Sequence, residues 1–323
     1  MKAIRIEKTG GADVMALRDV DLPAPGPGQI RVRHTAIGIN FIDIYHRTGL
    51  YPVPLPSGLG LEAAGVVEAL GEGVTAPAIG TRVGYCSGPI GAYAEAANVP
   101  AGRVVALPAS VPDEFAASSM LKGMTAQYLL KRTYAVKPGE TILFHAAAGG
   151  VGQIAVQWAK ALGATVIGTV GDAKKAEIVK ALGCDHVVNS RTENIAERVR
   201  AITKGEGVPV VYDSIGKDTF MASLDSLAVR GLLVSFGNAS GAVPAFEPGI
   251  LSAKGSLYLT RPTLFHYTRD TRELQETADD LFAILASGKV KIAPPARYAL
   301  ADAAKAHADL EGRRTAGALV LVP

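Results

Sequence analysis

A glycine-rich turn between an apolar strand and a helix is the segment of this sequence best suited to binding a charged ligand. The expected strand 141–147 runs into Ala-Ala-Gly-Gly-Val-Gly, which opens an expected helix over 151–162. Glycine lets the backbone approach a pyrophosphate, and a helix N-terminus offers unpaired N–H groups and a positive dipole end. Ala147 replaces the first glycine of the Gly-x-Gly-x-x-Gly fingerprint, but Gly149 and Gly152 remain. Because a strand, a helix and a second strand follow one another at the proper distances, we predict dinucleotide binding instead of simple chain reversal.

The end of the next expected strand distinguishes between the two nicotinamide dinucleotides. Sites that prefer NAD usually carry an acidic residue there, which binds the ribose 2′-hydroxyl. Here the strand ends in Thr-Val-Gly at 169–171, and Lys174 and Lys175 follow on the first turn of the next helix. Gly171 leaves room for a 2′-phosphate and the lysines attract it, so we predict NADPH as the cofactor. Asp172 either caps that helix or repels the phosphate, and we favour the cap.

Two rhythms along the chain indicate the elements that must position this turn. Up to about residue 110, short strand-like stretches alternate with Gly- and Pro-rich turns, which is typical of an antiparallel, partly closed β domain. An expected helix over 112–133 follows. Apolar strands then alternate with amphipathic helices, a pattern typical of a doubly wound parallel sheet. After about residue 260 a long helix over 271–286 and a last strand over 317–323 leave that rhythm, and this strand can rejoin the first domain.

Composition and charge exclude several classes of protein. The 323 residues are more than one hydrophobic core usually serves, so two domains are expected. The net charge of +3 is small and the basic residues are dispersed, which argues against a nucleic-acid partner. Cys86 and Cys184 are the only cysteines, too few for a disulfide framework or a four-thiolate zinc site. The sequence has neither a signal-peptide region nor an apolar stretch of about 18 residues, so a cytoplasmic location without membrane contact is expected.

The run over 139–160 resembles the signature of the quinone oxidoreductase and zeta-crystallin branch of the medium-chain dehydrogenases/reductases. The resemblance covers essentially the full chain, and it is carried by further runs at 36–52, 55–67, 212–220 and 234–243. It implies an α/β fold with a GroES-like, β-rich catalytic domain around a Rossmann domain with a doubly wound parallel sheet. The GroES-like domain is expected to be discontinuous, over 1–120 and 261–323, with the Rossmann NADPH-binding domain over 121–260. A homodimer is also expected from the resemblance, paired through an edge segment such as 232–238 or 255–261.

The resemblance also implies a set of site residues, position by position. Those that match the cofactor site or carry its glycine turn are Asn40, Phe41, Asp43, Tyr45, Thr125, Tyr128, Gly149, Gly150, Val151, Gly152, Gly171, Lys175, Ser190, Phe236, Gly237, Asn238 and Arg313. Asn40, Tyr45 and Tyr51 are expected to position the substrate through amide and phenol groups, although half-buried packing is the other interpretation of both tyrosines. Ser190 stands where close relatives have a tyrosine beside the 2′-phosphate. Its hydroxyl can still donate to a phosphate, but losing the ring weakens discrimination against NADH.

A metal is not expected in this chain. The zinc-containing relatives carry Gly-His-Glu, whereas this sequence has Gly-Leu-Glu at 60–62, and the segment 39–43 has no cysteine. A quinone is already electrophilic, so it needs only the nicotinamide held against its ring and a few hydrogen-bond donors. Glu62 then has a structural hydrogen-bonding role.

Three hypotheses of function follow. The first is reduction of quinones by NADPH, by hydride or single-electron transfer, and the second is reduction of an activated double bond such as that of an enone or alkenal. The third is an NADPH-binding protein, possibly a nucleic-acid-binding one, with little turnover. We favour the first.

Overall fold

The computed structural model describes every residue of the chain except 313 and 316. The described residues divide into two compact units, and each unit contains segments from distant parts of the sequence. The first comprises Met1–Lys122, Thr268–Ala278 and Ile292–Pro323, and the second comprises Gly123–Tyr267 and Asp279–Lys291. The predicted α/β class is confirmed, because one unit holds mainly antiparallel sheets and the other a parallel sheet. Among the described residues, no helix has the length and apolar character needed to cross a bilayer.

The second unit is built on the parallel sheet that the alternating rhythm predicted. Its strand order is β11-β10-β9-β12-β13-β14, so the chain starts in the middle and extends the sheet first to one side and then to the other. The strands are β9 (Thr141–Phe144), β10 (Thr165–Val170), β11 (His186–Asn189), β12 (Val208–Asp213), β13 (Leu227–Ser235) and β14 (Tyr258–Thr260). This is the order of a Rossmann sheet, in which ligands bind beyond the carboxyl ends of the strands.

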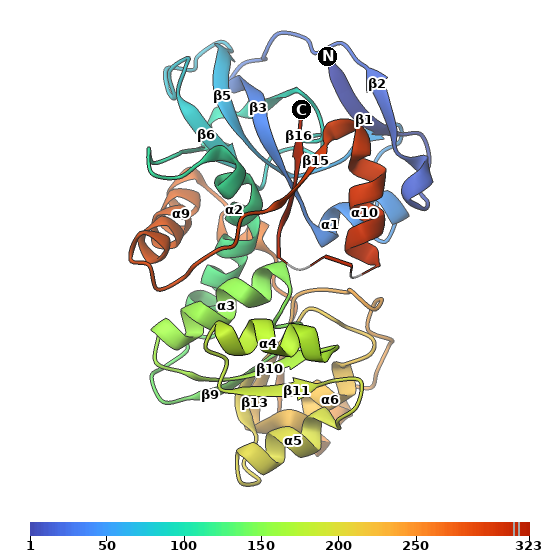
Figure 1. Ribbon diagram of the computed structural model, residues 1–323, viewed down its shortest axis with the longest axis vertical. Coiled ribbons are helices and arrows are strands. Elements are labelled where there is room, and N and C mark those ends of the chain that lie inside the picture. The colour runs from blue at the N-terminus through green and yellow to red at the C-terminus, as the bar shows by residue number, and fades with distance from the viewer. Residues whose placement is uncertain (313, 316) are drawn as a thin grey trace. The chain divides into compact units, whose positions relative to one another are not determined.

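Helices cover both faces of this sheet. In Figure 1, α3 (Gly150–Ala161) and α4 (Ala173–Ala181) lie against one face, and α5 (Ile195–Ile202) and α6 (Phe220–Ser226) lie against the other. The strands are therefore apolar on both faces, and Leu143, Val211 and Leu233 are fully buried. The short helices α7 (Gly249–Ala253) and α8 (Leu264–Tyr267) complete this unit.

The first unit contains a seven-stranded, mainly antiparallel sheet built around the long strand β3 (Gln29–Ile39), and a separate three-stranded antiparallel sheet. This strand pairs antiparallel with β5 (Glu62–Leu70), β7 (Ala96–Pro100) and β16 (Leu319–Val322). The other strands are β1 (Lys2–Ile6), β2 (Ala16–Asp19), β4 (Ser57–Gly58), β6 (Arg82–Tyr85), β8 (Val105–Ala106) and β15 (Ala296–Ala299). β15 departs from the antiparallel expectation, because it pairs in parallel with β16. Helices α1 (Phe41–Thr48) and α10 (Ala303–Glu311) also belong to this unit.

The long helix predicted over 112–133 forms two pieces, α2 (Asp113–Tyr128) and a π-helical turn at Leu129–Thr133. The hydroxyl of Tyr212 donates to the carbonyl of Leu129 at 3.2 Å. A side chain that donates to a helix carbonyl in this way disturbs the regular ladder of hydrogen bonds. The sequence pattern gives no sign of this contact. The helix predicted over 271–286 is confirmed as α9 (Thr271–Ala286).

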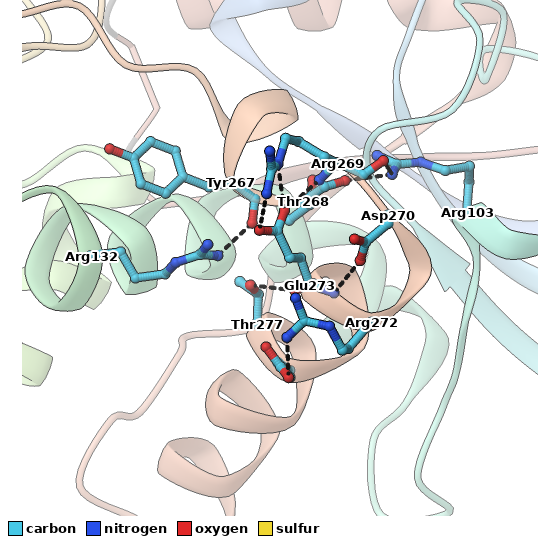
Figure 2. A network of polar contacts seen from close by, with 10 residues as sticks. Arg103, Arg132, Tyr267, Thr268, Arg269, Asp270, Arg272, Glu273 and Thr277 are labelled. Carbon is cyan, nitrogen blue, oxygen red and sulfur yellow. Dashed lines mark hydrogen bonds and ion pairs between the residues drawn. The ribbon is translucent and has the colours of Figure 1, made fainter.

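The chain passes from the second unit to the first between Tyr267 and Thr268, and an arginine of each unit binds its own side of this crossing (Figure 2). Arg132 donates to the carbonyl of Tyr267 and lies 5.2 Å from the centre of its ring. Arg103 donates to the carbonyl of Thr268. Backbone acceptors outside the sheets are thus satisfied by guanidinium groups.

Candidate functional site

The glycine turn has the geometry that a pyrophosphate site requires. Gly149 is the N-cap of α3, so Gly150 and Val151 are its first residues and their N–H groups lack acceptors within the helix. A Cβ atom on Gly152 would lie 2.4 Å from the carbonyl oxygen of Ala146 and 2.6 Å from that of Ala147. Only glycine lets the helix start this close to the turn. The residues present therefore fit a dinucleotide pyrophosphate.

The residues at the end of β10 form a small cluster with basic side chains. Asp172 is the N-cap of α4 and accepts from the backbone N–H of Lys175 at 2.9 Å, so the predicted cap is confirmed. Its second oxygen lies 3.9 Å from the ammonium of Lys175. Ser190 donates its hydroxyl to the carbonyl of Val170 at 3.1 Å. This hydrogen bond directs the hydroxyl of Ser190 toward the backbone of the cluster.

Arg191 is a member of this cluster that the sequence analysis did not single out. A Cβ atom on Gly171 would lie 3.5 Å from the Nε atom of Arg191, so the guanidinium stands directly beside that glycine. The parallel pairing of β10 with β11 sets Val170 opposite Asn189 and brings the following residues together. The signal in the sequence was a basic residue next to Ser190. That residue can be assigned to the cluster only when the register of β10 and β11 is known.

The loop over Phe236–Asn238 follows β13 and lies at the same edge of the sheet. The N–H of Phe236 donates to the carbonyl of Asp213 at 2.7 Å, and a Cβ atom on Gly237 would lie 2.5 Å from the carbonyl of Ser214. Since the glycine turn, Gly171 and Ser190 also follow parallel strands, the structure brings these predicted residues to one edge of the sheet. This edge is where open α/β sheets bind their ligands.

Thr125 and Tyr128 lie on α2, within the second unit. Both are buried, and the ring of Tyr128 stacks on that of Tyr267 with centroids 4.5 Å apart. Packing against another ring is thus part of the role of Tyr128. Arg313, predicted to contact the cofactor, lies outside the described residues.

The predicted substrate residues of the first unit gather around α1. Asn40 is the N-cap of this helix, and Tyr45 is buried on its inner side. The rings of Tyr45 and Tyr51 meet edge to face with centroids 5.1 Å apart, and Phe41 lies 6.3 Å from Tyr45. The structure therefore joins Phe41, Tyr45 and Tyr51 in one aromatic cluster, and Asn40 precedes it at the start of α1. The two tyrosine rings pack on each other.

Asp43 is fully buried in the first turn of α1. Its Oδ2 accepts from the N–H of Asn40 at 2.8 Å and from the hydroxyl of Tyr93 at 2.9 Å. Its Oδ1 has no hydrogen-bond partner among the described residues. Burial raises the pKa of this carboxyl to about 7. Asp43 thus orders the start of α1 from inside the protein.

Glu62 lies beside Asn40, and it makes hydrogen bonds as predicted. The carboxylate is fully buried, and it accepts from the side-chain N–H of Asn40 at 2.8 Å and from the backbone N–H of Leu121 at 2.7 Å. Within the part of the chain that the structure describes, no group of three or more His, Cys, Asp or Glu side chains has a metal-binding arrangement.

Comparison with known proteins gives the class first. Residues 26–109 match the family model of the alcohol dehydrogenase GroES-like domain, and residues 150–283 match that of the zinc-binding dehydrogenase. The chain is 53% identical to a quinone oxidoreductase of Pseudomonas aeruginosa, over 100% of this chain and 99% of that protein. A crystal structure of Escherichia coli quinone oxidoreductase complexed with NADPH has 50% sequence identity and a TM-score of 0.98, covering 100% of both chains. A 2-haloacrylate reductase of Burkholderia sp. is 48% identical over 98% of both chains.

The chain belongs to the quinone oxidoreductase family, a family of oxidoreductase enzymes. The predicted resemblance and the predicted fold, with a GroES-like domain and a Rossmann sheet, are confirmed.

Proposed function

We propose that this protein reduces quinones with NADPH. The observation that carries the proposal is the carboxyl edge of the parallel sheet, where a glycine turn and a basic cluster lie together in a chain 53% identical to a quinone oxidoreductase. The location in the cytoplasm, the homodimer and a discontinuous catalytic domain with a central cofactor domain belong to the same proposal.

The residues of the second unit hold the cofactor in this proposal. The first N–H groups of α3 bind the pyrophosphate, and Lys175 and Arg191 bind the 2′-phosphate. When bound, NADPH supplies the hydride. Phe236–Asn238 lie beside the nicotinamide ribose. In the first unit, Asn40, Tyr45 and Tyr51 donate hydrogen bonds to the quinone, and the two tyrosines present a ring face to it.

The proposal is tested by initial rates of NADPH oxidation at 340 nm with 1,4-benzoquinone, a naphthoquinone and an enone. We expect turnover with the quinones, and a lower kcat/KM when NADH replaces NADPH. An enzyme with no quinone turnover would contradict the proposal. NADPH binding without turnover of any acceptor would favour the binding-protein hypothesis.

Reduction of an activated double bond is the second candidate function. It is supported by the relative named 2-haloacrylate reductase, which is 48% identical to this chain. The same scaffold can deliver a hydride to such a double bond if a donor protonates the resulting carbanion. Turnover of the enone with inactive quinones would favour this candidate over the first.

Neutralising Lys175 or Arg191 is expected to lower the preference for NADPH. Lys175→Gln and Arg191→Gln each remove one charged partner of the 2′-phosphate, so the KM for NADPH should rise about tenfold while that for NADH stays unchanged. Lys174→Gln is the comparison variant: Lys174 is exposed on the same turn of α4, so water and salt screen its charge and its loss should raise the KM for NADPH less. An equal rise of KM for NADPH and NADH would mean that the substituted residue does not bind the 2′-phosphate.

A further inference from the structure

The side chain of Asn40 is held between two buried groups of opposite charge. Its Oδ1 accepts from the ammonium of Lys122 at 2.7 Å, and its Nδ2 donates to Glu62 at 2.8 Å. We call Glu62 and Lys122 the clamp. Lys122 also donates to the carbonyl of Ile39 at 3.2 Å, and its ammonium lies 3.7 Å from the carboxylate of Glu62. All these groups belong to the first unit.

The clamp determines which way the amide of Asn40 faces. A lysine ammonium has only donors, so it must face the amide oxygen, and an ionised carboxylate has only acceptors, so it must face the amide nitrogen. Rotating the amide by half a turn would set its N–H donors against the ammonium of Lys122 and its oxygen against the carboxylate of Glu62. The two partners therefore fix a single orientation.

Stability alone gives no reason for this arrangement. Glu62 is fully buried, and Lys122 is 7% exposed. Removing two charges from water is costly, and well-packed apolar residues often stabilise a fold as well as a buried ion pair does. Burial raises the pKa of Glu62, and the charge of Lys122 opposes that rise.

The neighbouring backbone is shaped to admit the clamp. Gly38 lies opposite Glu62 in the pairing of β3 with β5. A Cβ atom on Gly38 would lie 2.3 Å from the Oε2 atom of Glu62 and 2.1 Å from the carbonyl of Ala117. Any side chain at Gly38 would thus push the carboxylate away from Asn40.

We propose that Glu62 and Lys122 are positioning residues that orient the amide of Asn40 so that its second N–H donates to the oxygen of the quinone. An amide carries two N–H donors, and Glu62 takes one of them. A donor held in place toward the oxygen on which negative charge develops stabilises that charge without first having to reorient. This inference rests on the proposed function and assigns two residues to its substrate site.

The test is a mutant cycle between the clamp and Asn40. The double variant Glu62→Gln/Lys122→Met removes both charges together, so neither is left buried without its partner. We expect kcat with 1,4-benzoquinone to fall about tenfold, with the Kd for NADPH unchanged. In an Asn40→Ala background the same double variant should cause no further loss, because the clamp acts through Asn40. Lys2→Met/Asp19→Asn, which removes an exposed ion pair of the first unit, is the control and should keep full activity.

Two results would overturn the proposal: unchanged kcat in the double variant, or an equal loss with and without Asn40. A second readout does not depend on turnover. The side-chain N–H resonances of Asn40, assigned by their loss in Asn40→Ala, should exchange with water faster in the double variant. If the wild-type protein reduces no quinone, the proposed function fails and so does the donation to quinone, while this exchange measurement still decides whether the clamp holds Asn40.

Discussion

Replacing Gly152 with alanine is expected to raise the Kd for NADPH about 100-fold or more. The added Cβ would meet two backbone carbonyl oxygens, of Ala146 and Ala147, at 2.4 and 2.6 Å. Backbone atoms cannot turn aside as the end of a flexible side chain can, so the start of α3 must move by about 1 Å. That movement displaces the N–H groups of Gly150 and Val151 from the positions proposed for binding the pyrophosphate.

The measurement is a fluorescence titration of NADPH with wild type and variant, together with the thermal unfolding of each. Gly249→Ala is the matched control, because Gly249 opens helix α7 and an added Cβ would meet nothing within 4 Å. The control should bind NADPH as the wild type does. A folded Gly152→Ala protein with unchanged Kd would mean that the glycine turn does not bind the cofactor.

Local signals explain why the second unit was predicted well from the sequence. The turn over 147–152 and the cap at Asp172 depend on residues within a few positions of one another, and the apolar strands of the sheet are contiguous. A parallel sheet made of such units has few possible strand orders. Arg191 was missed because its place beside Gly171 comes from the pairing of β10 with β11.

The clamp could not be predicted from the sequence either, because its residues are brought together by tertiary packing and lie far apart in the chain. Asn40 and Glu62 are 22 positions apart, and Asn40 and Lys122 are 82 apart. No periodicity links them, and only the pairing of β3 with β5 and the packing of α2 bring them together. The family resemblance directed attention to the segment around Asp43. It gave no sign that this carboxyl is fully buried.

Asp43 is expected to make the protein less stable as the pH rises from about 4 to 8. Its pKa is raised to about 7 from the ordinary 3.8, mainly by burial, although hydrogen bonds from Asn40 and Tyr93 oppose the rise. The folded protein therefore holds a proton at Asp43 in a pH range in which the unfolded chain has released it. This contribution to stability is complete below the unfolded pKa and is lost as the pH rises through the folded pKa. The difference between the ordinary pKa of 3.8 and a pKa of about 7 corresponds to ~4 kcal/mol.

Asp43→Asn isolates this effect, because an amide oxygen can accept the same two hydrogen bonds and has no proton to lose. The free energy of unfolding of each protein is measured by urea titration between pH 4.5 and 8. The variant should gain on the wild type by up to ~4 kcal/mol across this range. His34 titrates in both proteins alike: burial lowers its pKa to about 4 from 6.5, so its contribution to stability, which is lost as the pH falls below 6.5, cancels in the difference between them. If the difference between the two proteins stayed constant with pH, Asp43 would be ionised throughout, and a partner for its Oδ1 would be needed to explain how a buried charge is stabilised there.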